Sequence, residues 1–204
     1  MTKLLVAVLL IAGLLGAGTT MAVADNTTDH SSPSYDMKAQ AMLDLETVQK
    51  KFVDLANAVP ADKFKWRPTS DTRSFAEVLL HVAGERYQIL GLMGANPPEH
   101  FNEKVFEKST TDKAQIVSQL NQTWEFTKQI LGTMSNADFA KALPKLGPQA
   151  NAGDVIYILV ADAHEHLGQA IVYARVNGVV PPWTVAARKK AAEKKAAEKK
   201  AKQN

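Results

Sequence analysis

The chain has 204 residues, 46% of them hydrophobic, which is enough to bury the core of one domain of ordinary size. It contains no cysteine, so disulfides, thiolate metal ligands and lipid attachment through a cysteine are excluded. The net charge of +3 comes from residues 188–204, with eight basic and two acidic residues, whereas residues 25–187 are mildly acidic, so we expect no specific nucleic-acid binding.

The first 24 residues have the pattern of a signal peptide. Lys3 precedes an apolar run over residues 4–15, and Ala22 and Ala24 are the small residues of a cleavage motif. The apolar run is shorter than the roughly 20 residues that a membrane-spanning helix needs. We therefore expect cleavage after Ala24, export to the periplasm or the medium, and a flexible polar spacer over residues 25–35.

Two helices are predicted in the first half of the remaining chain. Apolar residues recur every three or four positions over residues 41–59, which is the pattern of an amphipathic helix, and Pro60 ends it. Ser74 and Glu77 have the spacing of a capping box, so we expect a second helix to start there and to reach about Met93. Polar residues interrupt the apolar face of this second helix near its middle.

A proline-containing loop leads to a third helical pattern over residues 111–134, and a fourth covers residues 154–176. The fourth is apolar nearly all round, so we expect it to be the most buried. No alternating strand pattern and no repeat of fixed period is present in this part of the sequence. The sequence therefore predicts an all-α antiparallel four-helix bundle over residues 36–184, followed by a basic tail over residues 185–204.

The tail is rich in lysine and alanine and repeats the run AAEKK. Both residue types favour helix, so we expect a solvated and partly helical extension. The tail lacks the apolar face that insertion into a membrane needs. The alternative is an electrostatic contact with an anionic surface such as lipid head groups, a cell-wall polymer or nucleic acid.

Ionisable residues lie on the core-facing stripes of two predicted helices. Asp162 and His166 are four apart on the fourth helix, and His81 and Glu85 are four apart at the polar interruption of the second. Residues four apart share one face of a helix, and buried ionisable groups need partners. If the two faces meet, two imidazoles and at least one carboxylate converge.

Imidazole and carboxylate ligands without thiolate suit zinc, nickel, iron or manganese, and three protein ligands with an open position are typical of a catalytic site. His164 lies two residues from both Asp162 and His166, and a regular helix turns it about 200° away from them. We therefore favour Asp162 with His166 and keep His164 as the alternate ligand. The other interpretation is a buried polar network without metal, in which His166 pairs with Asp162 and His81 with Glu85.

The stretches WRPTSDTRSFAEVLLHVAGE (residues 66–85) and HEHLGQAIVYARVNGVVPPWT (residues 164–184) resemble the DinB-like superfamily of metal-binding four-helix bundles. In that family one histidine comes from the second helix, and two, four apart, come from the last helix just before a Gly-Gln pair. His81 matches the first, and His166 matches the last. The position four before His166 is Asp162 rather than histidine. The resemblance thus implies a divalent metal held by His81, Asp162 and His166.

The resemblance also implies two classes of function. Members of the family include thiol-dependent S-transferases and proteins grouped as hydrolases, so the first class is a metal-dependent transferase or hydrolase with an unknown small-molecule substrate. Glu85 or Gln169 would then orient ligands or substrate. The second class is a non-enzymatic binding or stress-related scaffold whose polar core is structural or a vestigial metal site. Bundles of this family often pair through helix faces, which makes a homodimer a further expectation.

Cleavage after Ala24 should give an exported protein that begins at Asp25, because small residues at positions 22 and 24 suit signal peptidase. Intact-mass measurement of protein isolated from the periplasm or the medium checks this. A mass that still includes Met1 would show that the leader is retained.

Overall fold

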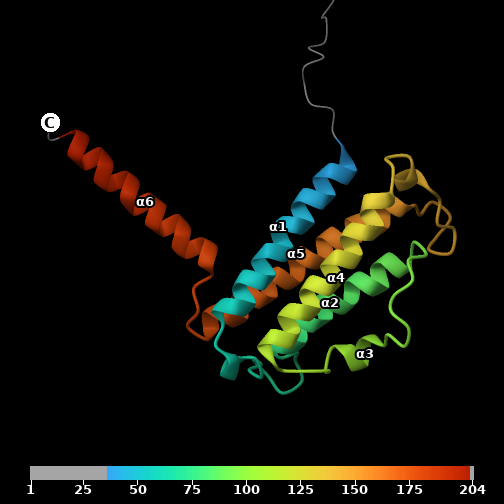
Figure 1. Ribbon diagram of the computed structural model, residues 1–204, viewed down its shortest axis with the longest axis horizontal. Helices are drawn as coiled ribbons and strands as arrows, with labels where there is room; N and C mark the ends of the chain where they lie inside the picture. Colours follow the sequence, from blue (N-terminus) through green and yellow to red (C-terminus); the bar gives the residue numbers. More distant parts are fainter. Residues whose placement is uncertain (1–35, 203–204) are drawn as a thin grey trace, which may run out of the picture. The chain divides into compact units, whose positions relative to one another are not determined.

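The computed structural model describes residues 36–202 (Figure 1), so the predicted signal peptide and spacer lie outside the described residues. No strand is found in this part of the chain, and none of its helices is long and apolar enough to cross a bilayer. The helices are α1 (Met37–Ala58), α2 (Phe75–Gly91), α3 (Glu103–Phe106), α4 (Lys113–Thr133), α5 (Ala152–Val176) and α6 (Pro182–Ala201), with 3-10 turns η1 (Ala61–Lys63) and η2 (Asp138–Ala140).

Helices α1, α2, α4 and α5 form the predicted four-helix bundle, in which α1 and α2 each pack against both α4 and α5. Figure 1 shows α2 and α4 running in one direction and α1 and α5 in the opposite one. The bundle is therefore not antiparallel throughout. Residues 92–112 must return along the bundle to connect the parallel pair, and this crossover carries α3. The crossover matters for the site because α3 packs against α2.

Side-chain caps define where the long helices start. Ser74 Oγ accepts a hydrogen bond from the backbone N–H of Glu77 at 3.2 Å, and Glu77 Oε2 accepts from the N–H of Ser74 at 2.6 Å, so the predicted capping box is confirmed. Helix α5 begins earlier than expected, because Asn151 caps it and Asp154 completes a second capping box. Asp112 caps α4 through its side chain, which accepts a hydrogen bond from the backbone N–H of Gln115, so the helix starts within two residues of the predicted position.

The core lies between the four bundle helices. The predicted apolar stripe of α1 is buried, and consists of Ala41, Leu45, Val48, Phe52 and Leu55. Helix α2 is the most buried, with 13 of 17 residues inaccessible against 11 of 25 in α5, so the expectation for the fourth predicted helix is wrong. The reason is that α2 is covered by α3 as well as by α4 and α5, whereas α5 leaves apolar residues such as Tyr157 and Val172 exposed.

The basic tail is helical over most of its length. Helix α6 starts at Pro182, whose missing N–H is tolerated in a first turn, and Pro181-Pro182 separates it from α5. Trp183 packs partly against the core, with Lys51 Nζ 5.9 Å from its ring centroid. Residues 185–202 are exposed, so the helix beyond Trp183 buries no face.

Deleting residues 188–204 should leave the free energy of unfolding unchanged to within about 0.5 kcal/mol, because the removed segment packs against nothing. Thermal or urea unfolding of the truncated and full-length proteins measures this. If the tail contacts anionic surfaces, binding to anionic vesicles should disappear on deletion and weaken with salt in the full chain. Loss of cooperative unfolding in the truncated protein would show that the tail is structural.

Candidate metal centre

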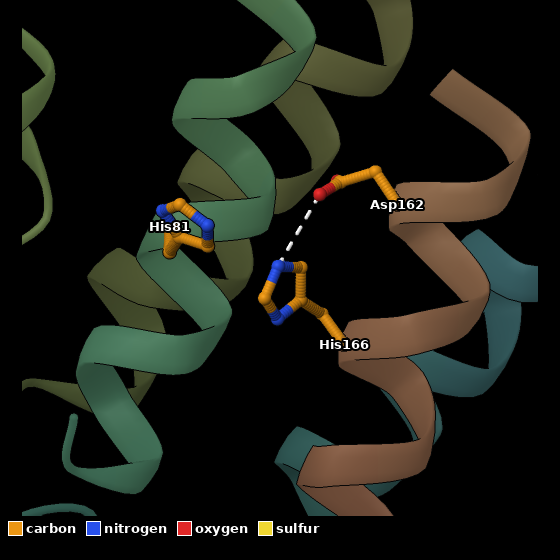
Figure 2. A group of neighbouring side chains, drawn as sticks. All are labelled: His81, Asp162 and His166. Atoms are coloured by element: carbon orange, nitrogen blue, oxygen red, sulfur yellow. Dashed lines mark ion pairs between the residues drawn. The ribbon is translucent and has the colours of Figure 1, made fainter. Parts of the chain in front are cut away.

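Helices α2 and α5 bring His81, Asp162 and His166 together (Figure 2). One ligand atom of each residue lies within 4.8 Å of those of the other two. The two imidazole rings meet edge to face with centroids 4.6 Å apart. None of the three side chains is more than 18% exposed. The structure thus gathers at one point the three residues that the sequence singled out.

Hydrogen bonds determine which nitrogen of His166 faces the site. Its Nδ1 lies 3.0 Å from Gln169 Oε1, while Gln169 Nε2 donates to the Tyr173 hydroxyl at 3.2 Å. Because an amide oxygen only accepts, His166 Nδ1 carries the hydrogen. A neutral His166 therefore presents the lone pair of Nε2 toward Asp162 Oδ1, 3.2 Å away. A lone pair facing a carboxylate requires a proton or a cation between them.

His164 lies apart from this cluster. Its Nε2 is 2.7 Å from Asp44 Oδ2 on α1, and its side chain is 49% exposed. A regular helix produces this separation, because residues two apart point about 200° away from each other. The structure therefore places His164 in a contact between α1 and α5 and not beside His81.

Two glutamates of the crossover lie on the other side of His81, and the sequence did not indicate them. His81 Nδ1 is 3.3 Å from Glu107 Oε2 and 3.5 Å from Glu103 Oε1. His81 Nε2 is 3.6 Å from Glu85 Oε1, its neighbour one turn along α2. His81, Glu85 and Glu103 form a second group whose ligand atoms lie within 4.8 Å of one another. The imidazole of His81 therefore has carboxylates near both of its nitrogens.

The crossover packs against α2 beside Gly84. A Cβ at this position would stand 3.4 Å from Phe106 Cδ1 and 3.5 Å from Phe101 Cζ, which is ordinary van der Waals contact. Tyr87 packs edge to face on Phe101, with centroids 5.1 Å apart. Asn102 caps α3 by accepting a hydrogen bond from the third residue of the helix. This cap was the available sequence signal, but a helix of four residues has no periodicity to support it.

Burial and neighbouring charges shift three pKa values in the cluster. Burial raises the pKa of Glu85 to about 7, and the Asp162 carboxylate adds to the increase. Burial lowers the pKa of His81. Burial acts the same way on His166, but hydrogen bonds to Asp162 and Gln169 outweigh it and raise its pKa above the ordinary value. The cluster thus holds more carboxylates than it easily keeps ionised, and a cation would relieve their repulsion.

Arg86 is a buried cation next to the cluster that the sequence analysis also missed. Its side chain is 3% exposed, and Nη1 donates to Leu120 O at 2.9 Å and to Thr123 Oγ1 at 3.2 Å on α4. Burial lowers its pKa to about 10, and the negative charge of Asp162 opposes this shift. Arg86 therefore stays charged near neutral pH and gives Asp162 a positive neighbour within the core.

The residues present fit a divalent metal ion. Imidazole nitrogens and carboxylate oxygens are donors that zinc, nickel, iron and manganese accept, and three of them leave coordination positions open. His81 Nδ1 is a buried polar atom without a hydrogen-bond partner among the described residues, so no hydrogen bond within this part of the protein fixes which ring nitrogen carries the hydrogen. The donor set of His81, Asp162 and His166 is therefore chemically suited to a divalent cation.

Residues 44–170 match the family model of the DinB superfamily, and because the match covers more than half of the chain, the protein belongs to this superfamily. Its fold is similar to that of a DinB-like protein from Bacillus cereus, with 14% identity and a TM-score of 0.59, covering 69% of this chain and 93% of that one. The fold is also similar to that of a conserved protein from Enterococcus faecalis, with 17% identity and a TM-score of 0.58, covering 70% of this chain and 97% of that one. No curated protein matches the chain.

Replacing Glu85 by glutamine should stabilise the metal-free protein at high pH. The pKa of Glu85, about 7 in the folded state, lies above its ordinary value of 4.5. Glu85 therefore contributes stability that is fully present below pH 4.5 and is lost as pH rises through 7. Glutamine cannot lose a proton, so the melting temperature of Glu85→Gln relative to wild type should increase between about pH 5 and about pH 8 in chelator-treated protein.

Glu99→Gln is the matched control, because the Glu99 side chain is 88% exposed and lies in the loop before α3. Its melting temperature should follow that of wild type across the same pH range. A constant difference between Glu85→Gln and wild type at all pH values would contradict the raised pKa.

Proposed function

We propose that this DinB protein is exported and binds one divalent cation, zinc, nickel, iron or manganese, through His81, Asp162 and His166. We propose further that the bound ion serves a metal-dependent transferase or hydrolase reaction on a small-molecule substrate. The observation that carries the proposal is the convergence of one donor atom from each of these residues within 4.8 Å. Membership of the DinB superfamily supports it.

The surrounding residues have distinct roles in this proposal. The ion would supply Lewis-acid chemistry. Gln169 holds His166 so that Nε2 faces the ion. Glu85, with a pKa of about 7 and a side chain 19% exposed, can accept or release a proton at its carboxylate near neutral pH. The centre thus combines an electrophile with a nearby proton acceptor.

A non-enzymatic scaffold is the second candidate, and one observation favours it. His166 and Asp162 form an ion pair at 3.2 Å, and the raised pKa of His166 lets a proton replace a metal ion between them. The polar core can then be satisfied without metal, as in a structural or vestigial site.

Two partners remain proposals. A homodimer through a helix face would use the outward side of α5, where Ile158 and Val172 are 46% and 56% exposed. An anionic surface would contact the exposed lysines of α6.

Zinc, nickel or manganese should raise the melting temperature of the chelator-treated protein. A ligand that binds only the native state adds about 2.7 kcal/mol at a hundredfold excess over its dissociation constant. The effect should fade below about pH 6, where histidines protonate and compete with the ion. His81→Ala and His166→Ala should each abolish the shift, and Asp162→Ala should weaken it strongly, with each variant compared with its own metal-free form.

His164→Ala is the matched control, because it removes an imidazole from the same helix without touching the cluster. It should keep the full metal-induced shift. Loss of the shift in His164→Ala, together with its retention in Asp162→Ala, would overturn the ligand assignment on α5. Absence of a shift in wild type with every metal would favour the scaffold.

A further inference from the structure

The surroundings of His81 constrain where its proton lies. An imidazole that binds a metal ion is neutral, and a neutral imidazole has one N–H and one lone pair. Carboxylate oxygens lie near both nitrogens, with Glu85 at 3.6 Å from Nε2 and Glu107 at 3.3 Å from Nδ1. One nitrogen therefore presents a lone pair to a carboxylate, unless a proton or a cation lies between them.

A cation held with Asp162 and His166 resolves this conflict. It takes the lone pair of His81 Nε2, and the hydrogen must then be on Nδ1, which faces α3. Nδ1 is inaccessible to solvent, so water cannot accept that hydrogen, and no protein atom among the described residues forms a hydrogen bond with it in this structure. The acceptor must come from one of the two glutamates of the crossover.

Glu107 is the better placed of the two. Its Oε2 is the nearer carboxylate oxygen, and its side chain is 13% exposed against 25% for Glu103. Arg73 Nε donates to Glu107 Oε1 at 2.9 Å, which holds one oxygen and leaves the other facing His81. Glu103, in contrast, accepts a hydrogen bond from Gln88 on α2.

We propose that Glu107, anchored by Arg73, is a positioning residue of the metal centre that accepts the Nδ1 hydrogen of His81 and so directs Nε2 to the ion. The proposal rests on the proposed metal binding and adds a residue and a mechanism to it. A carboxylate behind a ligand histidine fixes its tautomer and raises its basicity. The short α3 is thereby part of the centre, because it carries this acceptor at its end.

The test measures Zn²⁺ affinity of the purified, chelator-treated protein by calorimetry with a competing chelator. Glu107→Gln should weaken Zn²⁺ binding about 10- to 100-fold, because an amide oxygen is a weaker acceptor than a carboxylate. Glu107→Asp keeps the charge one methylene further away and should recover part of the loss. Arg73→Gln should reduce affinity in the same direction but less, since it frees Glu107 without removing it.

Glu103→Gln and Glu99→Gln are the controls. Glu103→Gln removes the same charge at a similar distance from Nδ1, 3.5 Å, and should lose less affinity than Glu107→Gln. Glu99→Gln removes an exposed charge before α3 and should leave affinity unchanged. An equal or greater loss of Zn²⁺ affinity in Glu103→Gln overturns the choice of Glu107. The loss would then come from the removed negative charge alone, or Glu103 would be the acceptor.

The ¹⁵N resonances of the His81 ring give a readout that a merely structural role would not move. Zn²⁺-bound wild type should show a protonated Nδ1 and a metal-bound Nε2, and the Nδ1 proton should exchange with solvent faster in Glu107→Gln. Wild-type binding with unchanged affinity in Glu107→Gln overturns this proposal alone. Failure of wild type to bind Zn²⁺ and every other metal overturns the proposed function and, with it, this one.

Discussion

A charged or polar side chain that is buried needs a partner inside the protein, because it has lost its contacts with water. The arrangement of the side chains between α2 and α5 follows from this requirement. His81, Glu85, Asp162 and His166 are all largely buried there, and Arg86 lies beside them. The free-energy cost of burying each of these side chains is offset by its interactions with the others. The surrounding leucine, valine and phenylalanine side chains exclude water, and the interactions among the polar groups are stronger for that reason.

The direction of the helices decides what can reach this buried cluster. Because α2 and α4 are parallel, the connection between them must travel the length of the bundle. It does so along α2, where Phe101 and Phe106 of the crossover pack beside Gly84. A tight turn between antiparallel helices would have brought no further carboxylates to His81. The long connection instead places Glu103 and Glu107 against it.

The sequence predicted the bundle and the three converging residues because both follow from helix periodicity. The four-residue spacings within α2 and α5 put each pair of side chains on one face, and burial of the apolar stripes turned those faces toward each other. Periodicity does not determine helix direction, so the parallel pair was not foreseen. Periodicity also gives no information about segments that lack a repeating apolar pattern, such as the crossover, so Glu103 and Glu107 were missed.

Arg86 was missed for a different reason. An arginine at the polar interruption of a helix is usually solvated, and only the structure shows that this one is buried and donates hydrogen bonds to Leu120 and Thr123 on α4. The prediction that α5 would be the most buried helix was wrong for a related reason. The number of neighbours that cover a helix depends on its place in the bundle, and hydrophobicity alone does not reveal that α3 covers α2.

The fluorescent side chain of Trp66 is connected to the candidate metal centre through Tyr173 and Gln169. Its indole packs edge to face on Tyr173, with ring centroids 5.3 Å apart. The Tyr173 hydroxyl accepts a hydrogen bond from Gln169, which in turn fixes the His166 ring. Trp124 and Trp183 line a different surface, between α1, α4 and the start of α6. Of the three indoles, Trp66 is therefore the one that these contacts connect to His166, and its fluorescence would report a change in the orientation of this proposed metal ligand.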